Sequence, residues 1–441
     1  MRLLIVDPQG AALDIAHRAK AHGHQVKHLI RDTPKTEHIG KGMIDVIRDG
    51  SLYYRWADLI FLADNTRWLH DLSPLQGDIP IVGPSPEMAA WELDRSAGQD
   101  VLKKHGIATI PSFEFSNYDK AIAHVKKHPI RWVSKPSGDA DKALSYCSNS
   151  AADMVYMLEK WKRSGKQRQF ILQEFIPGIE MAVGAWFGPH GWATPWLENW
   201  EFKKLMDGDK GVATGEQGTV VRHVSRSKLA KKVLEPLEET LIREKYIGYI
   251  DVNCIIDSRG IAWPLEFTVR PGWPTLNIQQ ELHEGDPVEW LMMLAAGKEP
   301  PVIENKVAIG VVVSIPDYPY SHLTRKEVIG APIYGLENPR LLPHVHFCEV
   351  MTGEAPHDCE GKIVAKPCHV TAGDYVLVMS AVGDTVYEAK QTAYRRLKRI
   401  SLPSSPMYRT DIGDRLAKQL PELQKHGYAN GMVFSDTQHP A

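Results

Sequence analysis

The sequence predicts an α/β protein of three domains: a doubly wound N-terminal domain, a larger α/β domain and a small mixed α/β C-terminal domain. The chain has 441 residues, of which 43% are hydrophobic, and this is more than one ordinary core accommodates. It begins with an apolar segment, a helical period and a second apolar segment, which is the order of a doubly wound fold. We therefore expect domains over residues 1–104, 105–305 and 306–441, with a mobile lid at about 115–180.

The N-terminal domain is expected to contain parallel strands at 3–7, 25–30, 57–64 and 79–85, with a helix from Ala11 to His22. Loops that follow such strands form ligand crevices. The first loop, DPQGAA at 7–12, lacks the GxGxxG pattern of a dinucleotide site. The sequence therefore argues against dinucleotide binding.

The middle domain alternates helical and apolar segments. Helices are expected at 91–105, 118–127, 151–163, 228–245 and 287–296, and strands at 131–136, 169–175 and 180–187. An aromatic stretch, 193–202, and a Gly-rich loop, 207–219, follow the third of these strands. Two apolar strands, 249–257 and 261–269, predict a hairpin that turns at Gly260.

The C-terminal domain is expected to begin after Pro300 and Pro301. Its predicted elements are strands at 308–315, 344–350 and 374–382, a helix at 385–400 and a polar tail.

Composition excludes several classes of function. Lys and Arg number 52 against 54 Asp and Glu, so no basic field attracts nucleic acid or an anionic membrane. No apolar run approaches the length of a membrane span, and the first residues read as a strand and turn rather than a signal peptide. Five cysteines without a CxxC pair fit a reducing compartment. We expect a cytosolic monomer or homodimer with small-molecule partners.

Polar residues on the predicted hairpin point to a magnesium site. Glu266 and Thr268 share one face of their strand by period two, and Arg270 continues it; Asp251 and Asn253 share a face of the partner strand. Oxygen ligands from two neighbouring strands suit Mg²⁺ beside phosphate oxygens. The alternative is that Glu266 forms a structural pair with Arg270.

Lys135 ends an apolar strand and precedes the loop 137–145, where it could contact a phosphate. A solvated strand terminus is the alternative. Gln173 to Ile176 could present backbone groups to adenine, and Glu180 could bind ribose hydroxyls.

Taken together and in order, these segments resemble the ATP-grasp fold, and their spacing is similar to that of the phosphoribosylamine–glycine ligase family. The motifs that carry the resemblance are WVSKP at 132–136, QEFIPGIE at 173–180, DGDKGVATGEQG at 207–218 and LEFTVR at 265–270. GPSPEMAAWEL at 83–93, GVVVSIPDYP at 310–319 and RTDIG at 409–413 extend it over all three domains.

The resemblance implies an ADP-forming, ATP-dependent ligase of purine biosynthesis that uses Mg²⁺ or Mn²⁺. It would activate glycine or another amino acid as an acyl phosphate and transfer it to an amine. The implied ATP-binding residues are Lys135, Lys142, Glu174, Ile176 and Glu180; the metal ligands are Glu266, Asn253 and Thr268; the catalytic residues are Arg270 and Lys210; and the substrate-binding residues are Asp209, Gly215, Gly218, Trp196, Trp200 and Trp273.

The sequence departs from the family at four places. The first loop, Pro8 to Leu13, lacks the family's charged phosphate-binding run, and the loop 137–145 carries two aspartates. Thr268 stands where the family has Asn, and PGWP at 271–274 replaces the family's Gly-Asp-Pro-Glu. We therefore expect a ligase whose amine acceptor has changed. The three tryptophans are either core residues or a platform for a flat acceptor.

Three alternatives remain open. The chain could be a genuine phosphoribosylamine–glycine ligase or a non-catalytic nucleotide-binding relative. A zinc module in the last domain would use histidines and cysteines, but their spacing matches no standard finger; they are His344, His346, Cys348, His357, Cys359, Cys368 and His369.

Overall fold

The computed structural model describes residues 1–65, 68–136, 145–165, 169–320 and 326–435, and it confirms the predicted α/β class. The N-terminal part contains a parallel sheet in the order β3-β2-β1-β4-β5, as in a doubly wound fold. Its elements are β1 (Arg2–Val6), α1 (Leu13–Ala21), β2 (Gln25–Leu29), β3 (Asp45–Ile47), β4 (Leu59–Leu62), α2 (Leu69–Leu72) and β5 (Ile81–Val82). Apolar residues of β1 and β4 are fully buried, which explains their unbroken apolar sequence.

Two helices replace the single helix expected at 91–105, namely α3 (Pro86–Leu93) and α4 (Arg95–Lys104). Asp94 separates them in an extended conformation, and its carboxylate accepts hydrogen bonds from the backbone N–H groups of Ser96 and Ala97. An Asp is more stable in this capping role than inside a helix, so the chain restarts a helix at Arg95.

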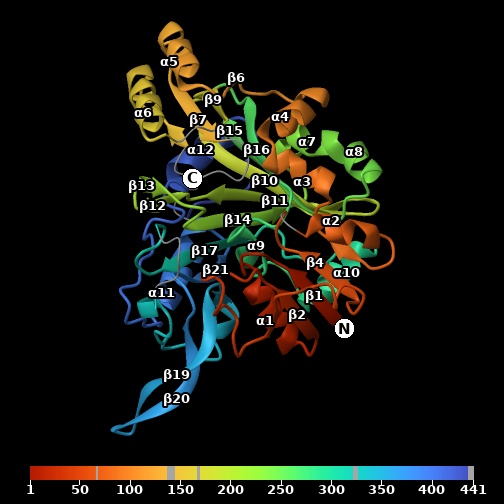
Figure 1. Cartoon of the computed structure of the whole chain (residues 1–441), viewed down its shortest axis with the longest axis vertical. Coiled ribbons are helices and arrows are strands. Elements are labelled where there is room, and N and C mark those ends of the chain that lie inside the picture. Colours follow the sequence, from red (N-terminus) through yellow and green to blue (C-terminus); the bar gives the residue numbers. More distant parts are fainter. Residues whose placement is uncertain (66–67, 137–144, 166–168, 321–325, 436–441) are drawn as a thin grey trace, which may run out of the picture.

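A small four-stranded sheet of order β6-β9-β7-β8 projects at the top of the molecule, with two helices packed together on it (Figure 1). Its elements are β6 (Ser112–Phe115), α5 (Tyr118–Lys127), β7 (Trp132–Pro136), β8 (Tyr146–Cys147), α6 (Ala151–Arg163) and β9 (Phe170–Glu174). Both helices have the predicted bounds, because Asn117 and Ser150 cap their first turns.

The main sheet has eight strands in the order β16-β15-β10-β11-β14-β17-β21-β18. The strands are β10 (Ile179–Gly188), β11 (Gly191–Glu201), β14 (Gly218–Val224), β15 (Gly248–Ile256), β16 (Ala262–Thr268), β17 (Val307–Ser314), β18 (Val345–Phe347) and β21 (Tyr375–Gly383). Helices α9 (Thr275–Gln279), α10 (Pro287–Ala295) and α11 (Val386–Leu397) accompany it. Strand β14 pairs with β17, so one sheet continues through the predicted boundary at Pro300 and Pro301.

Four further expectations differ from the structure. The helix expected at 228–245 is divided by a 3₁₀ turn at Glu235–Leu237, which contains Pro236, into α7 (Lys228–Val233) and α8 (Glu238–Arg243). The Gly-rich segment forms a hairpin of β12 (Lys204–Met206) and β13 (Lys210–Ala213). The tail contains α12 (Leu416–Lys425), and a ribbon of β19 (Val350–Cys359) and β20 (Lys362–Thr371) extends from the body (Figure 1).

Within the described part of the chain, no helix is both long enough and apolar enough to cross a membrane.

Candidate active site

The β15–β16 hairpin forms as predicted, with Gly260 at its turn in the left-handed region. Asn253 lies opposite Glu266, and Asp251 lies opposite Thr268. Directly opposed residues of antiparallel strands share a face, so the four side chains predicted to converge lie together on one face.

Cations surround Glu266. The N-terminus of α4 places Arg95 so that its Nη1 donates to Glu266 Oε2 at 2.6 Å. Burial acts to raise the pKa of Glu266, but Arg95, Lys135 and Lys203 hold that pKa well below its usual range. Lys135 therefore lies in this cluster, and burial lowers its own pKa to about 8. The pairing of Glu266 with Arg270, which the sequence left as an alternative, is not formed.

Lys203 links strand β10 to strand β11. Its Nζ lies 2.5 Å from Glu180 Oε1 and 3.0 Å from Glu201 Oε2. Burial acts to lower the pKa of Lys203, but Glu180 and Glu201 raise it well above its ordinary value. The Asn253 amide donates to both Glu201 oxygens at 3.3 Å. The predicted metal ligands Glu266 and Asn253 and the predicted ribose ligand Glu180 thus lie in one charged cluster.

Below this cluster lie further acidic groups. Asn199 Nδ2 donates to Asp251 Oδ2 at 2.7 Å, and the Tyr249 hydroxyl donates to the same oxygen at 3.1 Å. Burial and then Glu201 raise the pKa of Asp251 to about 7. Burial and then Glu201 also raise the pKa of Glu216 well above its ordinary value. These side chains are buried acids held close together.

Arg270 leaves this face and reaches the N-terminal domain. Its Nη2 donates to Glu92 Oε1 at 3.0 Å, while Glu92 Oε2 accepts the N–H of Val269 at 2.9 Å. Burial acts to lower the pKa of Arg270, but Glu92, Asp64 and Glu201 raise it. Arg270 therefore lies between carboxylates of the parallel sheet edge and those of the main sheet.

The β12–β13 hairpin holds Asp209, predicted for substrate binding, and Lys210, predicted as catalytic, whereas Gly215 and Gly218 follow the hairpin. Asp209 is ion-paired with Arg409 at 2.8 Å and with Arg415 at 3.2 Å. Lys210 and Gly215 are exposed. Gly218 begins β14, where a Cβ atom would lie 2.5 Å from the Gly310 carbonyl oxygen, so close packing of β14 on β17 requires this glycine.

The three predicted tryptophans lie in or against the core. Trp196 is 5% exposed and Trp200 is 0% exposed, so neither ring has a free face for an acceptor. Trp273 is partly buried, and its Nε1 donates to the Ala63 carbonyl oxygen at 3.1 Å. This arrangement corresponds to the core role that the sequence also allowed.

The predicted adenine segment lies at the end of β9. Glu174 is opposite Trp132 of β7, its N–H donates to the Pro111 carbonyl oxygen at 3.0 Å, and Ile176 follows in a partly buried position. Lys142 and the two loop aspartates, Asp139 and Asp141, lie outside the described residues.

The donor set fits a hard divalent cation. Glu266 is ionised because its pKa is low, and Asn253 Oδ1 is buried without a hydrogen-bond partner. Such oxygens are the ligands that Mg²⁺ prefers. Thr268 could add a hydroxyl oxygen from the same face.

The C-terminal histidines do not assemble a zinc site in the described residues, which contain no group of three or more His, Cys, Asp or Glu side chains able to hold a metal. His346 Nδ1 lies 2.7 Å from Asp14 Oδ2, and its Nε2 lies 2.8 Å from Ser380 Oγ. His344 Nδ1 lies 2.9 Å from Glu281 Oε1. Hydrogen bonds within the fold therefore engage both histidines.

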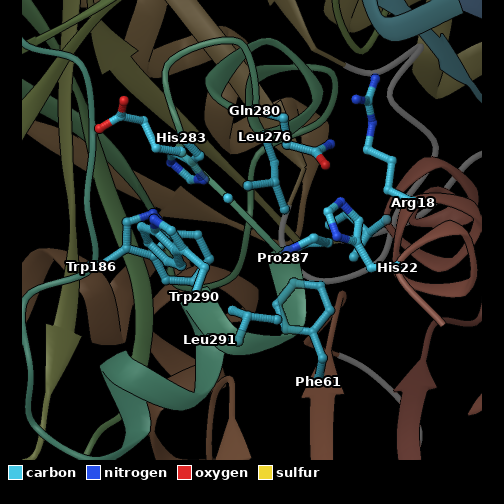
Figure 2. Close-up of a pocket in the computed structure, with 13 residues that line it drawn as sticks. Arg18, His22, Phe61, Trp186, Leu276, Gln280, His283, Pro287, Trp290 and Leu291 are labelled. Atoms are coloured by element: carbon cyan, nitrogen blue, oxygen red, sulfur yellow. The ribbon is translucent and has the colours of Figure 1, made fainter. Parts of the chain in front are cut away.

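A separate pocket of about 600 Å³, counting its open mouth, lies between α1 and the 276–291 segment (Figure 2). His283 stacks on Trp290 there, with ring centroids 4.2 Å apart. None of the predicted site residues lines this pocket. Its lining residues are Ile15, Arg18, His22, Phe61, Trp186, Leu276, Gln280, His283, Glu284, Gly285, Pro287, Trp290 and Leu291.

The prediction missed several members of the charged cluster. Asn199, Glu201 and Lys203 alternate along 199–203, and this period of two is the signal that would have found them. Arg95 gave no local signal, because its approach to Glu266 depends on how α4 packs against β16.

The chain is similar to known proteins along most of its length. Residues 94–275 match the family model described as phosphoribosylglycinamide synthetase, ATP-grasp (A) domain. A phosphoribosylamine–glycine ligase of Xanthomonas axonopodis is 27% identical over 350 residues, which are 76% of this chain and 77% of that protein. The enzyme of that name from Haemophilus influenzae is 25% identical and covers 79% of this chain and 80% of its own.

Solved structures show the same fold. Phosphoribosylamine–glycine ligase of Thermotoga maritima superposes with a TM-score of 0.70 at 21% identity, over 93% of this chain and 100% of that chain. Biotin carboxylase of Campylobacter jejuni superposes with a TM-score of 0.61 at 12% identity, over 97% of each chain. Residues 94–275 therefore form an ATP-grasp domain, and most of the chain is similar to phosphoribosylamine–glycine ligases.

Proposed function

We propose that the protein is an ATP-dependent carboxylate–amine ligase that activates an amino acid, with glycine preferred over others. It joins this amino acid to an amine that differs from phosphoribosylamine. One observation carries the proposal: Arg95 of α4, Lys135 of β7 and Lys203 between β11 and β12 surround Glu266 of β16. Phosphoryl transfer depends on positioning and on neutralising charge, and such a cluster supplies both.

The reaction has two steps. A carboxylate oxygen of the amino acid attacks the γ-phosphorus of ATP, and the bond to the β-phosphate breaks to give an acyl phosphate and ADP. The amine nitrogen then attacks the acyl carbon, the bond to the phosphate oxygen breaks, and the amine loses a proton as the amide forms. Phosphate leaves.

Each role falls to residues of this chain. Lys135 and Lys203 hold phosphate oxygens. Glu180 gives up its ion pair with Lys203 and accepts hydrogen bonds from the ribose hydroxyls. Glu174 and Ile176 flank adenine, and Lys142 adds a further cation. Magnesium, when bound, neutralises the triphosphate.

The remaining roles concern the metal and the acyl group. Glu266 and Asn253 would hold the metal, with Thr268 beside them. Arg270 stabilises charge at the reacting phosphoryl group, and Lys210 and Asp209 border the amino-acid site.

The experiment is a coupled assay of ADP release with ATP, Mg²⁺, single amino acids and a panel of amines that includes phosphoribosylamine. We expect ADP release that requires both an amino acid and an amine. Lys203→Met, whose side chain has similar length without charge, should lower kcat at least 100-fold. If ADP release were fastest with glycine and phosphoribosylamine, the protein would be a genuine phosphoribosylamine–glycine ligase. No ADP in any mixture would indicate a non-catalytic relative.

A further inference from the structure

The first loop of the N-terminal domain is filled by a side chain of the protein. Asp7 Oδ1 accepts hydrogen bonds from the N–H groups of Gln9 at 3.2 Å and Gly10 at 3.0 Å. Its Oδ2 accepts from Ala12 N–H at 2.7 Å and lies 3.0 Å from His28 Nε2. Backbone N–H groups in a loop between a parallel strand and a helix commonly bind anions. Here the carboxylate of Asp7 already holds them.

The surrounding sheet edge is also acidic. Asp64 follows β4 at the carboxyl edge beside Asp7, and Glu92 approaches from α3; both interact with Arg270. Two carboxylates, Asp64 and Glu92, therefore act on the Arg270 guanidinium, and Asp7 acts on Asp64. A phosphorylated substrate would meet net negative charge and loop amides that are already engaged.

On the main sheet, acceptor oxygens lie buried without donors. Glu216 is 5% exposed and its Oε1 has no hydrogen-bond partner. Asp251 Oδ1 and Asn199 Oδ1 are likewise buried and without a partner. Glu216 interacts electrostatically with Glu201, Lys203 and Asp251, so its carboxylate lies near these groups. Buried acceptors without donors are costly and rare, and an ammonium group with three N–H donors satisfies them.

Resting on the proposed ligase function, we propose that the amine substrate is an organic cation without a phosphate group, whose ammonium is bound by Glu216, Asp251 and Asn199, while Asp7 excludes phosphorylated amines. Arg270 lies between the two acidic groups, since it interacts with both Asp64 and Glu201. Arg270 therefore couples the two acidic groups electrostatically. A bound ammonium would also supply the positive charge that Glu216 needs in order to ionise.

The first test compares amines in the ADP assay: butane-1,4-diamine, butylamine, phosphoethanolamine and phosphoribosylamine. We expect kcat/KM for the unphosphorylated amines to exceed that for the phosphorylated amines at least 100-fold. Glu216→Gln should raise KM for the amine about tenfold, in keeping with loss of one charge-assisted hydrogen bond, and leave KM for ATP and the amino acid within twofold. Preference for a phosphorylated amine, or an unchanged amine KM, would overturn the proposal.

Two further variants test the proposal. Glu349→Gln controls for folding: it removes another buried carboxylate, whose pKa is raised to about 7 by burial and which, like Glu216, acts on Tyr375, and it should leave the amine KM unchanged. Asp7→Asn keeps Oδ1 as an acceptor but removes the charge, and it should raise kcat/KM for phosphoethanolamine several-fold. An equal effect of Glu216→Gln and Glu349→Gln on the amine KM would count against the proposal.

Binding is measured separately from turnover, so that failure of the proposed ligase function can be distinguished from failure of the proposed amine site. Calorimetric titration of butane-1,4-diamine into the full chain, with a non-hydrolysable ATP analogue and Mg²⁺, should show binding that Glu216→Gln weakens about tenfold, whether or not ADP is ever released. No diamine binding overturns the proposal. It is equally overturned if Glu216→Gln weakens binding of MgCl₂ alone and not of the diamine, which would make these oxygens a metal site.

Discussion

Lys135 illustrates how burial turns a common residue into a pH-sensitive one. Its pKa is lowered to about 8, chiefly by burial, although Glu266 acts to raise it. If Lys135 holds phosphate oxygens, ATP affinity should fall as pH rises through about 8, because the ammonium loses its charge. Titration calorimetry of ATP between pH 7 and 9.5 measures this.

The matched variant is Lys135→Arg, whose guanidinium stays charged throughout this range. It should flatten the pH profile while retaining affinity at pH 7. If the parent and Lys135→Arg lost affinity in parallel, another group would be responsible.

His223 predicts a second pH effect, on stability. Burial lowers its pKa to about 4, while the nearby backbone carbonyl of Pro195 acts to raise it. The unfolded chain therefore binds more protons than the folded chain between about pH 6.5 and 4, so stability is lost as pH falls through this window. The full effect of this residue is on the order of 3 kcal/mol. His283, which lines the pocket of Figure 2, also has a pKa lowered by burial.

Chemical denaturation of the parent and His223→Phe at pH 7.5, 6 and 5 tests this effect. The difference in free energy of unfolding should shift in favour of the variant as pH falls. A difference that stays constant across these pH values would show that His223 does not titrate on unfolding.

At the scale of elements, the β12–β13 hairpin depends on the C-terminal segment. Arg409 is buried between Asp411, with Nε at 2.7 Å from Oδ1, and Asp209. Gly208 N–H donates to Asp411 Oδ2 at 2.8 Å. Asp209→Asn removes the charge that faces Arg409 and Arg415. It should lower the free energy of local opening of the hairpin by about 1–2 kcal/mol.

Hydrogen exchange measures this local opening. Amides of 204–213 should exchange about tenfold faster in Asp209→Asn, with the rest of the molecule unchanged. Asp45→Asn, which alters an ion pair with Lys27 on the N-terminal sheet, is the control. Faster exchange throughout the chain, or none in the hairpin, would contradict this role.

Elements were predictable from sequence where local signals decide them. The caps at Asn117 and Ser150 fixed two helices, and Gly260 fixed the hairpin turn. The charged cluster was predictable only within a strand, as for Glu266 and Thr268. Lys203 could have been found from its period-two spacing with Asn199 and Glu201, whereas Arg95 reaches the cluster through packing of α4 against β16, which periodicity cannot reveal. The interpretation of 91–105 as one helix failed because Asp94 caps rather than continues it.

At the scale of the whole molecule, the main sheet joins segments on both sides of the predicted boundary at 305. Strand β14 pairs with β17, and Gly218 permits that contact because a Cβ atom would meet the Gly310 carbonyl oxygen. A fragment of residues 1–305 would expose the edge of β14 and the apolar surface that β17 and β21 cover. We therefore expect this fragment to lack a cooperative thermal transition.

Differential scanning calorimetry of the full chain and the fragment compares them directly. The full chain should unfold without a separate transition for residues 306–441. A fragment 1–305 that melts cooperatively at the temperature of the full chain would show that the sheet does not unite these segments.

The central claim is that the protein activates a carboxylate with ATP, and transfer of ¹⁸O tests it most directly. The protein is incubated with ATP, Mg²⁺, an amine and glycine labelled with ¹⁸O in its carboxylate, and the phosphate released is analysed by mass spectrometry. Formation of an acyl phosphate predicts one ¹⁸O atom in each phosphate formed from fully labelled glycine, with Lys203→Met releasing little phosphate. Phosphate without ¹⁸O, formed at a rate independent of glycine and the amine, would show hydrolysis of ATP by water and contradict the account.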